Sequence, residues 1–150
     1  MRMLLAALGA ALLLPALAAA PARACAVFTP LDTETVAAAP VVVRGTIDAI
    51  AVGDDLGVTF TVVVGETLRG PDAARWVVNW AAHSAVAPPH SLAEAADRYG
   101  TDIVIGFLPA EPAVTDGSGA GTIPPFACGE PFLGGFADLQ PLLRQAGLVP

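Results

Sequence analysis

The chain has 150 residues, enough for one compact domain of ordinary size and too few for two. Its seven basic residues are all arginines and face 14 acidic residues, so the net charge is −7. That balance argues against a nucleic-acid partner, because phosphate binding needs clustered cations, and equally against docking on anionic lipid.

The first 24 residues have the three parts of a secretory signal peptide. A short basic start is followed by an almost unbroken Leu/Ala run over residues 4–17, and a small-x-small cleavage site ends at Ala24. An N-terminal membrane anchor is the alternative, but the apolar stretch is short for a span and contains Pro15. We therefore expect a secreted or periplasmic domain over residues 25–150, with no membrane span after cleavage.

Cleavage after Ala24 makes Cys25 the first residue of the mature chain, and Cys128 is the only other cysteine. Two cysteines in an oxidising compartment usually pair, so we expect a disulfide between Cys25 and Cys128. The chain-entropy model values a closed loop of about 100 residues at roughly 4 to 5 kcal/mol. The alternative is a lipoprotein acylated on Cys25, which fits less well because Arg23 stands where small apolar residues are favoured.

The first elements expected after Cys25 are a short helix and two strands. Asp32 is a suitable N-cap for a helix over residues 33–39, and Pro40 ends that helix. Alternating apolar and polar residues then predict strands over about 41–49 and 58–68, joined by the turn residues between them. The two strands are expected to form a hairpin.

Three further strands are predicted in the second half. Residues 76–80 carry both tryptophans on one face, most simply as core, and an Ala/Pro/His segment follows over residues 81–99. The fourth strand, residues 101–108, is expected to end at Pro109 and Pro112. Residues 111–121 are then predicted to be a mobile, glycine-rich loop and residues 122–127 a short fifth strand.

The chain closes with a predicted amphipathic helix over about residues 137–146. Asp138 is its expected N-cap, Pro141 lies in its first turn, and Gly147 stops it. Five short strands with two flanking helices and little room for parallel crossovers predict a mainly β fold. We expect a small, antiparallel, five-stranded β-barrel of the oligonucleotide/oligosaccharide-binding (OB) type within a single domain, residues 25–150.

Several short motifs follow Cys25 in a familiar order. They are Val41-Val42-Val43-Arg44-Gly45-Thr46-Ile47, Thr59-Phe60-Thr61-Val62, Leu68-Arg69-Gly70 and Arg98-Tyr99-Gly100, with Cys128 after them. Together they resemble the netrin-module family, which includes the tissue inhibitors of metalloproteinases and small secreted bacterial relatives. The resemblance covers most of residues 25–128 and implies an OB-type barrel and a disulfide from the first residue.

The sequence departs from that family in its cysteines. Family members commonly begin Cys-x-Cys, but Val27 stands at the second place and no cysteine occurs near residues 81–90. The inhibitors chelate a protease zinc through the first cysteine, a role that maps only onto Cys25. Without a second bridge the ridge presenting Cys25 is less preorganised, so inhibition is an alternative rather than the leading expectation.

Few residues suggest catalytic or metal chemistry. His83 and His90 alone are too few for a metal site, although Glu94 or Asp97 could complete one if the loop folded back. His83, Ser84 and Asp97 are the residue types of a hydrolytic triad, but no nucleophile elbow surrounds the serine. We therefore predict no catalytic residue, cofactor or metal.

The leading expectation is a non-enzymatic binding protein whose partner is a protein or a small ligand. Function in such barrels concentrates on loops carried by a rigid scaffold, so the candidate interaction residues are Cys25, Ala26, Val27, His83 and His90. The alternatives are a metalloproteinase inhibitor acting through Cys25, a lipid-anchored envelope protein, and a hydrolase or metal-binding protein using the loop from His83 to His90.

Overall fold

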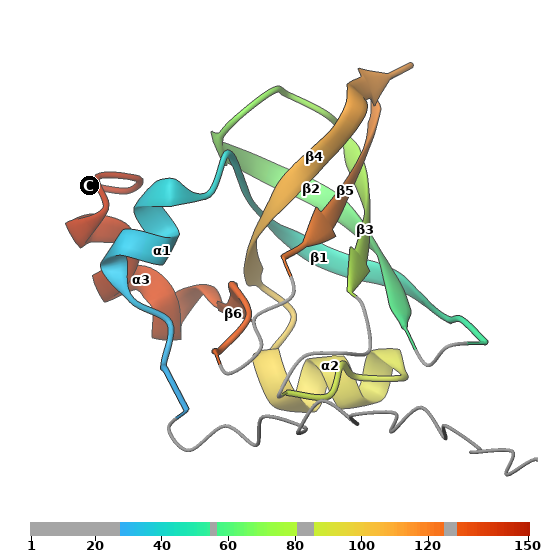
Figure 1. Cartoon of the computed structure of the whole chain (residues 1–150), viewed down its shortest axis with the longest axis horizontal. Helices are drawn as coiled ribbons and strands as arrows, with labels where there is room; N and C mark the ends of the chain where they lie inside the picture. The colour runs from blue at the N-terminus through green and yellow to red at the C-terminus, as the bar shows by residue number, and fades with distance from the viewer. Residues whose placement is uncertain (1–27, 55–56, 81–85, 125–128) are drawn as a thin grey trace, which may run out of the picture.

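The computed structural model of the protein describes residues 28–54, 57–80, 86–124 and 129–150 (Figure 1). In chain order its elements are α1 (Thr33–Ala38), β1 (Val41–Val52), β2 (Val58–Arg69), β3 (Arg75–Trp80), α2 (Leu92–Tyr99), β4 (Ile103–Thr115), β5 (Ser118–Ile123), β6 (Leu133–Gly135) and α3 (Phe136–Gln145). None of the helices in these ranges has both the length and the apolar character needed to cross a membrane.

Five strands close into a barrel in the order β1-β2-β3-β5-β4, because β4 pairs back onto β1, and β6 adds one short strand beside β4. The chain thus forms the expected mainly β, OB-like barrel with short helices at the N- and C-terminal sides. One pair differs from an entirely antiparallel barrel: β3 and β5 run parallel. A long connection through α2 and β4 separates these two strands, and parallel pairing requires such a connection.

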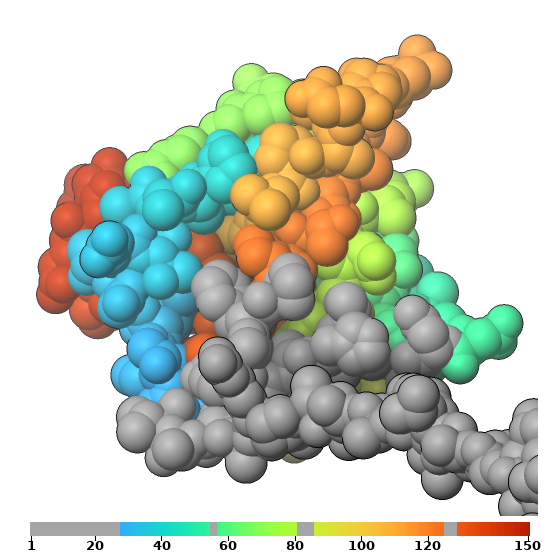
Figure 2. Space-filling model, in the orientation of Figure 1, coloured from blue at the N-terminus to red at the C-terminus, as the bar shows by residue number. Residues whose placement is uncertain are grey.

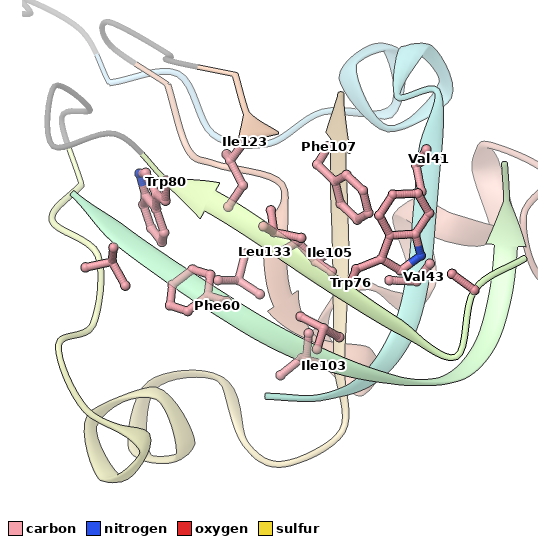
Figure 3. Close-up of a cluster of buried hydrophobic side chains, with 14 residues drawn as sticks. Val41, Val43, Phe60, Trp76, Trp80, Ile103, Ile105, Phe107, Ile123 and Leu133 are labelled. Carbon is pink, nitrogen blue, oxygen red and sulfur yellow. The ribbon is translucent and has the colours of Figure 1, made fainter. Parts of the chain in front are cut away.

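The barrel interior is filled by the inward-facing residues of its strands (Figure 3). β3 buries Trp76, Val78 and Trp80 and exposes the residues between them. The Trp76 ring meets Phe107 edge-on with 4.8 Å between ring centroids, and Phe60 meets Trp80 in the same way at 5.9 Å. Both tryptophans are therefore core residues, as their shared strand face predicted.

β5 presents glycines to this aromatic interior. A Cβ built on Gly119 would lie 2.3 Å from ring carbons of Trp76, and one on Gly121 would lie 2.4 Å from a ring carbon of Phe107. No side chain fits at such distances. The glycines are thus required by close packing of β5 against two large rings.

The prediction of a mobile loop over residues 111–121 is wrong, because these residues form the hairpin between β4 and β5. Asp116 and Gly117 have positive φ angles of 50° and 73° and make its turn, as in tight hairpins. The fifth strand therefore begins at Ser118 rather than at residue 122. The end predicted for it, residues 125–127, lies outside the described residues.

The prediction that Pro109 and Pro112 end the fourth strand is also wrong. β4 pairs with β1 only as far as Phe107, so beyond it β4 has a partner strand on one side alone. Pro109 is paired with β5, and the next residue of β4 that is paired with β5 is Val114. Pro112 lies in the unpaired stretch between them. A residue without an amide donor is tolerated there because no neighbouring strand requires the donor.

A second, smaller core joins the helices to the outside of the barrel. Val42 of β1 and Val104 of β4 point away from the barrel interior. They pack with Val36 of α1, with Leu143 of α3 and with Phe132, which precedes β6. Helices α1 and α3 lie side by side over this surface (Figure 1). The start of β1 is consequently buried on both faces, which strict alternation of buried and exposed residues does not describe.

The two terminal helices differ in how well their starts were predicted. Asp32 is the N-cap of α1 as expected, and its carboxylate accepts a hydrogen bond from the Thr35 backbone N–H at 2.8 Å. The N-cap of α3 is Gly135 instead of Asp138, because β6 leads directly into the helix. Asp138 therefore lies inside the first turn, and Pro141 lies beyond it.

α2 lies in the segment over residues 81–99 for which no helix was predicted. The Ser91 hydroxyl accepts a hydrogen bond from the Glu94 backbone N–H at 3.1 Å, while the Glu94 carboxylate accepts one from the His90 N–H at 2.8 Å. This reciprocal pattern is close to a capping box, whose Ser-x-x-Glu spacing is present in the sequence. The helix lies across the lower end of the barrel in Figure 1.

Candidate functional site

Most of the interaction residues proposed from the sequence lie outside the described residues. These are Cys25, Ala26, Val27 and His83, and Cys128 of the expected disulfide lies outside them as well. His90 is described and exposed, and its backbone N–H is bonded to Glu94 at the start of α2. His90 therefore takes part in capping α2 through its backbone. No group of three or more potential metal ligands occurs in the described ranges.

The chain that follows Cys25 by a few residues runs beside the chain that follows Cys128. Thr29 and Gly129 form an isolated parallel β-bridge, and the Glu130 N–H donates to the Thr29 carbonyl at 2.9 Å. The Glu130 carboxylate in turn accepts from the Leu31 N–H at 3.1 Å. The start of the described chain is therefore held against the segment between β5 and β6.

The arginines of the described ranges are all engaged with the chain's own groups. Arg44 donates two hydrogen bonds to Asp102, at 2.8 and 2.7 Å, and its guanidinium lies 3.7 Å from the centroid of the Phe136 ring. Hydrogen bonding from Arg44 holds the pKa of Asp102 below its ordinary value. This cluster links β1, the residue before β4 and the first residue of α3.

The other described arginines are likewise occupied. Arg98 pairs with Glu94 one turn earlier in α2 at 2.6 Å. Arg69 donates to carbonyl oxygens at the end of α1, and Arg144 donates to the carbonyl oxygen of Pro150. Arg75 forms an ion pair with Asp48 at 3.9 Å. The described surface consequently has no free cationic cluster that would hold a phosphate backbone.

A groove lies between α1 and residues 106–108 of β4, next to Pro124 just after the end of β5. Its volume is about 460 Å³, within the range of small-molecule and peptide sites. Apolar and acidic side chains line it, among them Asp32, Glu34, Pro40, Leu108, Pro124 and Phe132. Figure 2 shows α1 and the β4–β5 pair next to each other on the face toward the viewer.

The two kinds of lining residue occupy different elements. Leu108 of β4 leaves 49% of its surface exposed, while Phe132 is buried in the second core. Asp32 and Glu34 come from the start of α1 and are exposed. The Thr35 backbone N–H keeps the pKa of Asp32 lowered, so its carboxylate is charged at neutral pH.

Contacts at both ends of α1 fix this wall of the groove. The Arg69 guanidinium at the end of β2 donates to the carbonyls of Val36 and Ala39 at 3.3 and 3.1 Å, which satisfies the carbonyls at the end of the helix. At the other end the Thr33 hydroxyl hydrogen bonds the Gln145 side chain of α3 at 2.9 Å. The groove is therefore bordered by anchored elements.

Two other hollows lie on the described surface. One of about 450 Å³ surrounds Arg44 and Asp102, whose polar groups are already paired with each other. The other, of about 280 Å³, lies between α2 and α3 and includes Tyr99, Glu130 and Asp138. Burial raises the pKa of Tyr99, so this phenol stays protonated at neutral pH.

The comparison with known proteins adds no relative. A scan against models of protein families finds no match, and a search of curated proteins finds none either. Sequence reasoning missed the groove because its residues come from positions as far apart as Asp32 and Phe132, and no local spacing indicates that they meet.

Proposed function

We propose that this protein is an exported, non-enzymatic binding protein that holds its partner in the groove between α1 and β4. The observation that carries the proposal is the groove itself, which combines a half-exposed Leu108 and a buried Phe132 with two charged carboxylates. Binding sites are commonly concave and mostly apolar, with a few polar groups that set orientation. Hydrogen bonds to β2 and α3 also hold α1, which forms one wall of the groove, in place.

The engaged arginines support a partner other than nucleic acid. OB-type barrels that bind nucleic acid do so with a cationic surface that neutralises phosphates. In this chain Arg44 and Arg98 are paired with acids, and Arg69 is bonded to the end of α1. A protein or a small ligand is the partner class compatible with such a surface.

Export and a Cys25–Cys128 disulfide are part of the same proposal. The signal-like N-terminal sequence and the netrin-like order of motifs support export. The Thr29–Gly129 bridge supports the disulfide, since Thr29 is four residues after Cys25 and Gly129 directly follows Cys128. A Cys25–Cys128 disulfide would hold in place the N-terminal chain that leads into α1 and the groove.

Nuclear magnetic resonance on the exported, isotope-labelled protein tests the proposal. Titration with a library of small amphipathic compounds and short peptides is expected to shift the amide signals of residues 106–108 and of α1. The variant Leu108→Lys should abolish these shifts because it places a charge on the apolar floor. Val52→Lys is the matched control, since Val52 is 48% exposed and lies at the end of β1 away from the groove. Binding that centres on other residues, or that survives Leu108→Lys, contradicts the proposal.

A further inference from the structure

The groove has a charged rim that the described part of the chain does not neutralise. Asp32 and Glu34 stand at the start of α1, and none of the ion pairs among the described residues involves either of them. Arg69 does contact α1, but its guanidinium is bonded to carbonyls at the opposite end of the helix. Two negative charges therefore border an apolar floor without a cation from the described chain.

The apolar floor continues onto an uncharged strip of the barrel. Leu108 pairs in register with Thr122 of β5, and Thr122 pairs with Asn79 of β3. All three side chains are exposed, because the residues beside them in each strand point inward. Hydroxyl and amide groups of this kind donate and accept hydrogen bonds with peptide groups.

From this arrangement we infer that the groove takes an extended segment of a partner protein in which a basic side chain lies near a bulky apolar one. The apolar side chain packs on Leu108 over Phe132, the basic one faces Asp32 and Glu34, and the peptide backbone runs over the strip formed by Thr122 and Asn79. Because the rim is negatively charged, it favours a positively charged segment. Because the strip of Thr122 and Asn79 extends beyond the groove, it favours a peptide chain over a single small molecule. This inference rests on the binding role proposed above.

The test uses the exported protein and two matched peptides. Each is an acetylated, amidated peptide of eight residues with one phenylalanine two residues from the variable position, where one peptide has arginine and the other uncharged citrulline. Isothermal titration calorimetry at low salt, with peptide up to about 1 mM, measures both affinities. The arginine peptide is expected to bind more tightly, and its advantage should shrink as salt is added.

Variants then separate the rim from the floor. The double variant Asp32→Asn, Glu34→Gln removes both charges and keeps α1, because asparagine is as good an N-cap as aspartate. It should lower the affinity for the arginine peptide roughly three- to tenfold and leave the citrulline peptide unchanged. Asp97→Asn on α2 removes an exposed charge away from the groove and should change neither affinity.

The outcomes distinguish this inference from the proposed function. Equal binding of both peptides that is lost in Leu108→Lys would overturn the cationic segment and leave the groove as a binding site. Peptide binding that Leu108→Lys leaves intact, or no binding of either peptide while small amphipathic compounds bind at residues 106–108, would also overturn the inference. No ligand of any class at the groove would overturn the inference together with the proposed function.

Discussion

Gly119 offers a sharp test of the packing inside the barrel. In Gly119→Ala the added Cβ would be 2.3 Å from ring carbons of Trp76, a side chain that is fully buried and already packed edge-on against Phe107. An ordinary contact begins near 3.4 Å, so the strand or the ring must move by about 1 Å in a close-packed core.

The expected cost follows from what surrounds the glycine. Overpacking of a core costs about 1 to 3 kcal/mol, and the atoms that the new Cβ would meet all belong to the Trp76 ring, which is not the flexible end of a side chain. We therefore expect a loss of about 3 kcal/mol, which lowers the thermal midpoint by roughly 10 °C in a domain of this size. A loss this large is a substantial part of the 5 to 15 kcal/mol typical of whole domains.

Gly65→Ala is the matched control, because Gly65 is also a strand glycine but is exposed. A Cβ there would have its closest neighbour, the Arg44 carbonyl oxygen, at 3.7 Å, which is an ordinary contact. This substitution should be neutral or stabilise by up to about 1 kcal/mol, since alanine restricts the unfolded chain. Urea unfolding followed by tryptophan fluorescence measures both variants. If Gly119→Ala were within 0.5 kcal/mol of the parent, the packing argument would be refuted.

Three further predictions concern charge and the cysteines. Arg44→Gln should lower the thermal midpoint more than Arg75→Gln, because Arg44 is bidentate and stacked whereas Arg75 has one ion pair at 3.9 Å; equal effects in calorimetry would contradict this. The pKa of Asp102 is lowered from 3.8 by the Arg44 hydrogen bonds, so this carboxylate stabilises the fold above about pH 4 and the contribution is lost as pH falls through the lowered pKa. Urea midpoints measured between about pH 2 and 5 should therefore fall less steeply for Asp102→Asn, and an unchanged slope would refute the linkage. The exported protein should have the mass of residues 25–150 less two hydrogens, and Cys128→Ser should cost roughly 4 kcal/mol; a mass raised by a diacylglycerol group would instead support a lipid anchor on Cys25.

Sequence patterns predicted the parts of the fold that depend on local alternation. β2 buries Val58, Phe60 and Val62 as the period of two requires, and β3 buries both tryptophans. The N-cap of α1 was also predicted, because Asp32 acts on an amide only three residues away. These features depend on neighbours in sequence, which is why sequence alone was sufficient.

The features that were missed depend on distant residues. Glycine at position 119 looks like a loop signal locally, but it is required by a ring that belongs to β3. Pro112 looks like the end of a strand, but it is accommodated where β4 has lost one neighbour. The groove is the same kind of case, since it exists only after α1, β4 and the segment before β6 come together.

The strand order also determines how the protein reaches its folded state. Closing the barrel requires β1 to meet β4, which pairs Val41 with Phe107, and β3 to meet β5, which pairs Trp80 with Ile123. These pairings join distant parts of the chain, and a high relative contact order makes folding slow. The barrel cannot close until residue 123 has been synthesised, so the N-terminal strands must wait for their partners until most of the chain has been made.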